Sequence, residues 1–132
     1  MNASARHRVA VILPCYNEEA AIAEVVTEFK NALPSAEIYV YDNASTDRTV
    51  EVAREAGAHV RSEPEKGKGN AVRRAFADVD ADIYVMADGD GTYDAASAQK
   101  LIDTMRRQNL DMVVGTRTHT SETAYRLSLI HI

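Results

Sequence analysis

Short apolar runs alternate along this chain with segments in which apolar residues recur every three or four positions. The runs are typical of buried strands, and the recurring pattern is typical of helices that bury one face. The predicted strands are 8–13, 38–41, 58–62, 82–87 and 111–115. The predicted helices carry their apolar stripes over 22–33, 50–56, 72–79 and 98–105.

Regular alternation of strands and helices favours right-handed crossovers and a parallel sheet with helices on both faces. The sequence therefore predicts an α/β protein, a three-layer α/β/α sandwich with a mainly parallel sheet. Asn17 is predicted to cap the first helix and Asp94 the fourth, because both side chains can accept hydrogen bonds from helix amides. Gly57 lies where the second helix should end in a left-handed residue.

Clusters of polar residues and glycines follow the predicted strands. They occupy positions 14–17, 42–47, 66–69, 88–90 and 115–117. The carboxyl ends of parallel strands lie along one edge of a sheet, and open sheets of this kind bind their ligands there. We therefore expect these five loops to form one site.

The segment Asp88-Gly89-Asp90 gives this site its chemistry, because a buried strand stops there at two nearby carboxylates. Such carboxylates repel each other unless one is protonated or a cation lies between them. The sequence predicts that Asp88 and Asp90 bind Mg²⁺ or Mn²⁺ together with phosphate oxygens. A plain turn is the alternative. An EF-hand is excluded, because Tyr93 stands where that loop needs glycine and Gln99 where it needs glutamate.

The other loops each have a functional and a structural interpretation. Two lysines and two glycines in 66–69 precede a helix and suit an anion, although the loop matches neither a Walker motif nor a dinucleotide fingerprint. The alternative is an exposed charged loop. Asp42, at the end of a buried strand, can accept hydrogen bonds from a ligand or can cap a turn. Tyr16 can stack on a base or pack locally, and Arg117 can bind phosphate or remain on the surface.

Composition limits the class of protein. The chain has 132 residues, enough for one domain, and its net charge of −5 argues against a nucleic-acid-binding surface. Its single cysteine, Cys15, has no internal disulfide partner and no nearby histidine, so we expect a packed thiol in a reducing compartment. We find no signal peptide and no apolar stretch near the roughly 20 residues that span a bilayer. We expect a cytoplasmic location for this chain. We expect the full-length protein to lie at the cytoplasmic face of a membrane.

Taken together, five motifs resemble family 2 glycosyltransferases of the GT-A fold, which is Rossmann-like. They are LPCYNEE at 13–19, YDNASTD at 41–47, GKGN at 67–70, DGD at 88–90 and GTR at 115–117. The resemblance covers about residues 8–117 and implies the nucleotide-binding half of that fold. In detail the motifs are most similar to enzymes that transfer a sugar to dolichyl or undecaprenyl phosphate.

The resemblance implies roles for individual residues. Asp42 would bind the base, Lys68 would lie near the phosphates, and Asp88, Asp90 and Arg117 would be catalytic, with the two aspartates holding the metal. The implied nucleotide-binding residues are Pro14, Tyr16, Asn17, Glu18, Asp42, Asn43, Ser45, Gly67, Lys68, Gly69, Asp88 and Gly89. Two positions depart from the family pattern. Asn43 replaces a common second aspartate, and Thr92 stands where some relatives have glutamine.

The implied activity is metal-dependent, inverting transfer of a sugar from a UDP- or GDP-linked donor, with polyprenyl phosphate as acceptor. Alternatives are a hydroxyl acceptor, a sugar nucleotidyltransferase and a nucleotide-binding module without turnover. We expect residues 1–117 to form the nucleotide-sugar-binding half-domain. Family members continue well beyond the motif at 115–117, so residues 118–132 are expected to be a tail, non-native or disordered, on a fragment.

Overall fold

The computed structural model describes residues 8–92, 94–115 and 127–131. Its sheet contains six strands in the order β3-β2-β1-β4-β6-β5. The strands are β1 (Val9–Cys15), β2 (Glu37–Asp42), β3 (His59–Ser62), β4 (Ile83–Met86), β5 (Met112–Gly115) and β6 (Leu127–His131). The first four are parallel neighbours, so the predicted parallel sheet is confirmed for this part of the chain.

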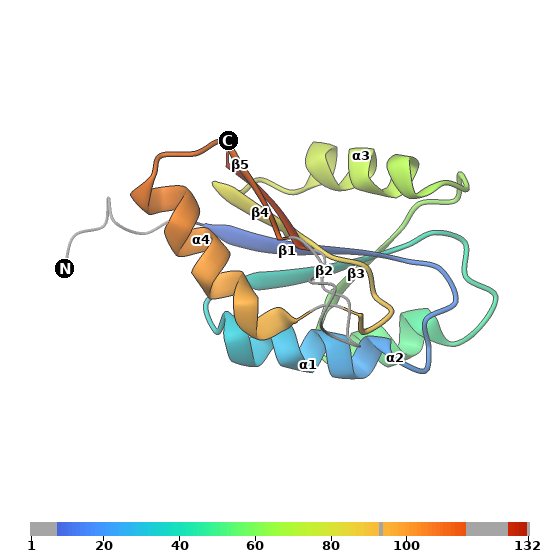
Figure 1. Ribbon diagram of the computed structural model, residues 1–132. Coiled ribbons are helices and arrows are strands. Elements are labelled where there is room, and N and C mark those ends of the chain that lie inside the picture. The colour runs from blue at the N-terminus through green and yellow to red at the C-terminus, as the bar shows by residue number, and fades with distance from the viewer. Residues whose placement is uncertain (1–7, 93, 116–126, 132) are drawn as a thin grey trace.

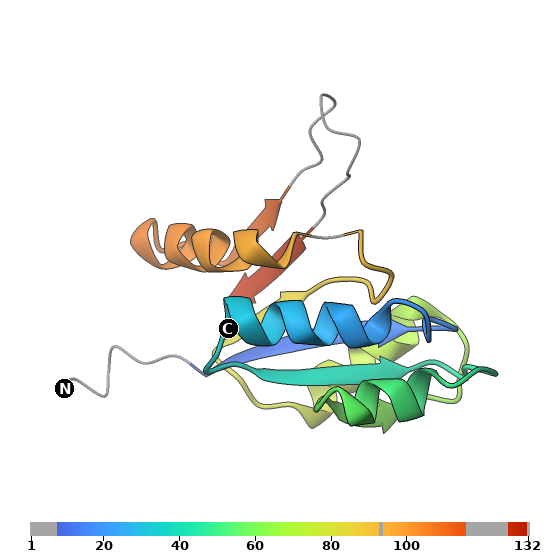
Figure 2. The ribbon, with the colours of Figure 1, turned by 90° about the horizontal axis from the view of Figure 1, so that it is seen from below.

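The sheet departs from the prediction beyond β4. Strand β6, which the sequence did not predict, pairs antiparallel with both β4 and β5 and separates them. Strand β5 therefore runs in the same direction as β1–β4, although it does not pair with them. Figure 2 shows β5 and β6 beyond β4, next to the last helix. The proposed division into a half-domain ending at 117 and a separate tail stays a prediction.

Helices cover the two faces of the sheet, as the alternating pattern predicts. They are α1 (Ile22–Ala32), α2 (Thr49–Glu55), α3 (Lys68–Asp78) and α4 (Ala98–Arg107), with a short 3₁₀ turn, η2, at Ala95–Ser97. Figure 1 shows α3 on one face of the sheet and α1 and α2 on the other. The described residues thus form the expected three-layer sandwich.

Alternate residues of β1 face the two cores. Val11, Leu13 and Cys15 pack in one buried cluster with apolar residues of α1, α2 and α4. Ala10 and Ile12 lie in a second cluster with Ala71 and Ala75 of α3 and with Tyr41 and Tyr84 of the sheet. Because β1 is buried on both faces, its sequence is continuously apolar up to Cys15. This buried central strand ends at the predicted site.

One of the predicted helix-end signals is confirmed, because Gly57 has φ +97° just beyond α2. Asp94 caps the 3₁₀ turn η2, where its side chain accepts a hydrogen bond from the Ala96 amide, whereas α4 itself begins after Ser97 without a side-chain cap. Asn17, however, does not cap α1, which begins only at Ile22. Asn17 instead has φ 53°, and its Oδ1 accepts a hydrogen bond from the Thr46 amide at 2.8 Å. The Asn17 side chain therefore joins the loops after β1 and β2, because it accepts from the Thr46 amide and not from an amide of α1.

Candidate active site

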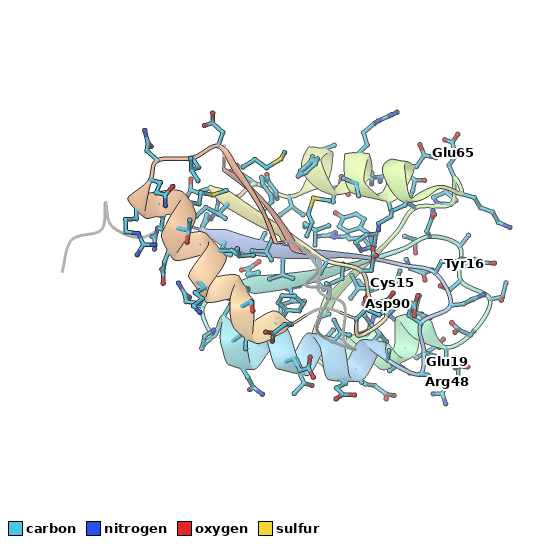
Figure 3. The ribbon with its side chains drawn as sticks, viewed as in Figure 1. Cys15, Tyr16, Glu19, Arg48, Glu65 and Asp90 are labelled. Carbon is cyan, nitrogen blue, oxygen red and sulfur yellow. The ribbon has the colours of Figure 1, made fainter. Side chains whose placement is uncertain are left out.

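A cavity of about 520 Å³ lies at the carboxyl ends of the central strands. It is lined by Pro14, Cys15, Tyr16, Glu18, Asn43, Lys66, Gly67, Lys68, Asp88 and Asp90. Figure 3 shows Cys15, Tyr16, Asp90 and Glu65 at the same end of the molecule. Loops that follow β1, β2, β3 and β4 thus meet at one cavity, as their positions after parallel strands predict.

The loops after β1 and β2 are joined by reciprocal hydrogen bonds. The Asn17 amide donates to Ser45 Oγ at 2.9 Å, and the Glu18 amide donates to Thr49 Oγ1 at 2.9 Å. The Glu19 side chain in turn accepts from the Arg48 amide at 3.1 Å, and Figure 3 shows these two residues together. Asn17 and Ser45 therefore brace the cavity wall and are not among the residues that line it.

Asp42 ends β2 as a buried carboxylate, with 5% of its surface exposed. One oxygen, Oδ2, accepts a hydrogen bond from the Ser45 amide at 3.3 Å. The other, Oδ1, is buried without a hydrogen-bond partner among the residues the structure describes. A buried carboxylate oxygen without a partner is costly, and each such atom in a folded protein needs an explanation. Asp42 is not among the residues that line the cavity, so its contact with a base stays a prediction.

The two aspartates after β4 lie in different surroundings. Asp88 is partly buried and forms an ion pair with the Lys68 ammonium group. Asp90 is exposed, and its Oδ1 accepts hydrogen bonds from the amide and the hydroxyl of Thr92 at 3.0 and 2.7 Å. Thr92, noted as a departure from the family pattern, thus orients the second aspartate.

Gly89 allows the aspartate pair to pack closely against β1. A Cβ atom at this position would overlap Cys15 Sγ and would lie 3.1 Å from Ile22 Cδ1. Gly89 has no positive φ, so space and not backbone conformation requires glycine here. The sequence predicted Gly89 as a nucleotide-binding residue, and the structure shows it buried and not among the residues that line the cavity. Its contact with Cys15 could not be predicted from sequence spacing.

Negative charge gathers at the cavity and changes the ionisation of two groups. Burial raises the pKa of Glu18 above 4.5, and the negative charges of Asp90, Asp88 and Asp47 raise it further. Burial, followed by the charges of nearby carboxylates, raises the pKa of the Cys15 thiol far above its usual value. Cys15 is therefore a protonated, packed side chain at neutral pH, as its sequence surroundings predict.

The donor set of the cavity suits a hard divalent cation that binds together with phosphate. Among the described residues, no three acidic, histidine or cysteine side chains form a metal site by themselves. Mg²⁺ beside a nucleotide normally uses one or two carboxylates and completes its shell with phosphate oxygens and water. Asp88 and Asp90 match that requirement in type and in number. They fit a cation that arrives with the nucleotide.

Asn43 has a role that the sequence did not predict. Its side-chain amide binds three backbone groups of the loop between β3 and α3, including the Gly67 amide at 2.8 Å. The glycine-rich sequence suggested that the backbone N–H groups of this loop bind an anion. The N–H of Gly67 instead donates to Asn43 Oδ1 and is not directed at an anion. Gly69 lies in the first turn of α3 with open space around it, and Lys66 lines the cavity. Arg117 lies outside the described residues.

A family model for glycosyl transferase family 2 matches residues 10–131. This chain belongs to that family. The family 2 assignment agrees with a relative that is 59% identical over 114 residues, protein RfbJ of Shigella flexneri, with 86% of this chain and 88% of RfbJ covered. Dolichol-phosphate mannosyltransferase of Pyrococcus furiosus is 34% identical over 117 residues, which span 83% of this chain and 33% of that protein.

Solved structures place this family 2 chain in the GT-A fold. Glucosyl-3-phosphoglycerate synthase of Mycobacterium tuberculosis, in complex with Mn²⁺, UDP and glucosyl-3-phosphoglycerate, aligns with TM-score 0.76 and 27% identity. The alignment covers 89% of this chain and 46% of that one. A Pyrobaculum calidifontis mannosyltransferase in complex with GDP-mannose and Mn²⁺ shares the fold, with TM-score 0.80, 21% identity and coverage of 96% and 45%. This chain thus spans less than half of each of these two structures.

Within the described residues, no helix is both long enough and apolar enough to cross a membrane.

Proposed function

We propose that this chain forms the donor-binding part of a metal-dependent, inverting glycosyltransferase. The donor is a UDP- or GDP-linked sugar, and the acceptor is a polyprenyl phosphate. The main support is the cavity itself, which Asp88, Asp90 and two lysines line together at the carboxyl ends of parallel strands. One cavity therefore offers oxygen ligands for a cation and positive charge for a diphosphate.

The base and the diphosphate of the donor each have a matching group, and the cation has two ligands. Tyr16, with 49% of its surface exposed, offers an aromatic face at the cavity, and the unpartnered Asp42 Oδ1 can accept an N–H group of the base. Lys66 and Lys68 supply positive charge on the phosphate side. Asp88 and Asp90 would hold Mg²⁺ or Mn²⁺, which when bound neutralises charge that develops on the departing nucleoside diphosphate. Mn²⁺ and nucleotides in the two structural neighbours support this assignment.

The acceptor assignment rests on relatives and on chemistry. The Pyrococcus mannosyltransferase is named for dolichol phosphate, and a 35% identical relative from Haloferax volcanii is named dolichyl-phosphate hexose transferase. A phosphate acceptor is already ionised at neutral pH, so it can attack the sugar carbon without a general base. Attack from the side opposite the nucleotide inverts the configuration of that carbon. Holding the two reactants in line supplies up to about 7–11 kcal/mol of the barrier reduction.

Turnover assays separate this proposal from its alternatives. In one set of reactions the chain is incubated with labelled UDP- and GDP-sugars, Mn²⁺ and either undecaprenyl phosphate, dolichyl phosphate or a saccharide acceptor. In a second set it is incubated with sugar phosphate, nucleoside triphosphate and Mn²⁺. A labelled glycolipid with inverted anomeric configuration supports the proposal. A product formed only with a saccharide acceptor indicates a hydroxyl acceptor. Release of pyrophosphate from sugar phosphate and nucleoside triphosphate indicates a nucleotidyltransferase, and nucleotide binding without any product indicates a binding module.

A further inference from the structure

Asn43 is a buried side chain whose hydrogen bonds are directed to a single loop. Its Nδ2 group donates to the backbone oxygens of Glu63 and Glu65 at 2.9 and 2.8 Å. Its Oδ1 accepts from the Gly67 amide at 2.8 Å. Both N–H groups of the amide are therefore used within the protein. Figure 3 shows Glu65 on this loop, at the outer end of the molecule.

The loop held by Asn43 carries the positive charge of the cavity. It connects β3 to α3 and contains Lys66, and α3 begins at Lys68, whose ammonium group pairs with Asp88. Gly67, between the two lysines, has φ +130°, a conformation that favours glycine. A backbone hydrogen bond also holds the loop to β2. The Glu63 N–H donates to the backbone carbonyl oxygen of Asp42 at 2.8 Å.

We propose that Asn43 is a positioning residue that holds the lysine loop in place, and that its side chain is not a nucleotide ligand. The chemistry of this position requires an amide. An aspartate could still accept from Gly67, but its second oxygen would face two carbonyl oxygens that now receive N–H groups. The expected effect of Asn43 on nucleotide binding rests on the function proposed above. Its expected effect on the order of the loop does not.

Loop order is measured first, on the protein without nucleotide. The variants are Asn43→Asp, Asn43→Ala and the control Asn109→Asp, which places the same charge in the exposed turn after α4. Limited trypsin digestion followed by mass spectrometry reports cleavage after Lys66 and Lys68, with cleavage after Lys100 in α4 as internal reference. Cleavage of a transiently opened loop follows the population of the open form.

We expect both Asn43 variants to be cleaved after Lys66 about tenfold faster than the parent, because about 1.4 kcal/mol of lost hydrogen bonding changes the open population tenfold. The Asn109→Asp variant should match the parent. Parent-like cleavage of the two Asn43 variants overturns the proposal. If neither variant folds, hydrogen exchange of the unmodified protein decides. The Gly67 amide should then exchange at least about tenfold more slowly than in a free peptide, and exchange at the free rate overturns the proposal.

Nucleotide affinity distinguishes positioning from direct contact. Calorimetry with UDP and GDP, each compared with its monophosphate, should show affinity in the order parent, then Asn43→Ala, then Asn43→Asp, with the larger loss for the diphosphate. A direct ligand that accepts hydrogen bonds would instead tolerate aspartate better than alanine, and that order overturns the proposal. If the parent binds neither nucleotide, the proposed function fails, while the digestion experiment still decides the role of Asn43.

Discussion

Gly89 lies so close to Cys15 that a methyl group on its Cα would overlap the cysteine sulfur. This contact joins the end of β1 to the turn that carries Asp88 and Asp90. Both residues are buried, so neither can move away into solvent. The position of the aspartate pair therefore depends on the close approach of the Gly89 backbone to the Cys15 side chain.

Replacing Gly89 with alanine should lower the free energy of unfolding by about 1–3 kcal/mol, because an extra methyl group in a packed region forces displacement. Urea denaturation measures this change. Adding Cys15→Ala removes the sulfur and should recover part of the loss, so that the double variant is more stable than the sum of the single effects predicts. Strict additivity of the two substitutions would show that the contact is not important for stability.

The proposed metal role of Asp90 can be tested without disturbing its hydrogen bonds to Thr92. In Asp90→Asn, Oδ1 can still accept from the Thr92 amide and hydroxyl, but the negative charge is lost. We expect the gain in UDP or GDP affinity on addition of Mn²⁺ to fall at least about tenfold, equivalent to about 1.4 kcal/mol. Calorimetry with and without Mn²⁺ measures this gain.

Asp111→Asn is the matched control for that experiment, since Asp111 is exposed beside the amino end of β5. It removes the same charge at the edge of the sheet opposite the cavity and should bind nucleotide as the parent does. An Asp90→Asn variant with the Mn²⁺ dependence of the parent would refute the metal assignment.

The Asp42 carboxylate should lower the stability of the fold and raise the affinity for nucleotide. Its buried Oδ1 has no hydrogen-bond partner among the described residues, so Asp42→Asn should leave stability unchanged or raise it by about 1 kcal/mol. The same substitution replaces an acceptor with a donor and should weaken nucleotide binding about tenfold or more. Urea denaturation and calorimetry test the two effects separately. Lower stability with unchanged affinity would indicate that Asp42 only supports the turn at Ser45.

Glu18 should give the ligand-free protein a characteristic dependence on pH. Burial, and then nearby carboxylates, raise the pKa of Glu18 in the folded state, so the folded protein retains this proton at pH values where the unfolded chain has lost it. The stabilisation from protonated Glu18 is therefore fully present below the unfolded pKa and is lost as pH rises through the folded pKa.

Denaturation of the parent and of Glu18→Gln at several pH values measures this contribution. The stability of the parent relative to Glu18→Gln should decrease as pH rises above 4.5 and then level off. A relative stability that increases with pH over this range would show that the folded state favours ionised Glu18.

The sequence determined the layers of the fold and the edge of the sheet that carries the site. Continuous apolar residues in β1 and helical spacing in α1 reflect burial along each element, which a single sequence records directly. The positions of Asp42, Lys68, Asp88 and Asp90 follow from this, because loops after parallel strands share one edge. These inferences need only local patterns and one rule of sheet geometry.

Only the tertiary structure decided which polar groups meet. Asn17 has the sequence signal of a helix cap, yet it binds Thr46, because a loop distant in sequence provides a closer donor. The sequence places Asn43 among the expected nucleotide ligands. In the structure its side chain is hydrogen-bonded to the loop before α3. Strand β6 lies between β4 and β5, where the periodicity predicted no strand. Hydrogen bonds and strand pairing between distant segments depend on which groups folding brings within about 3 Å of each other, and residue spacing does not encode that.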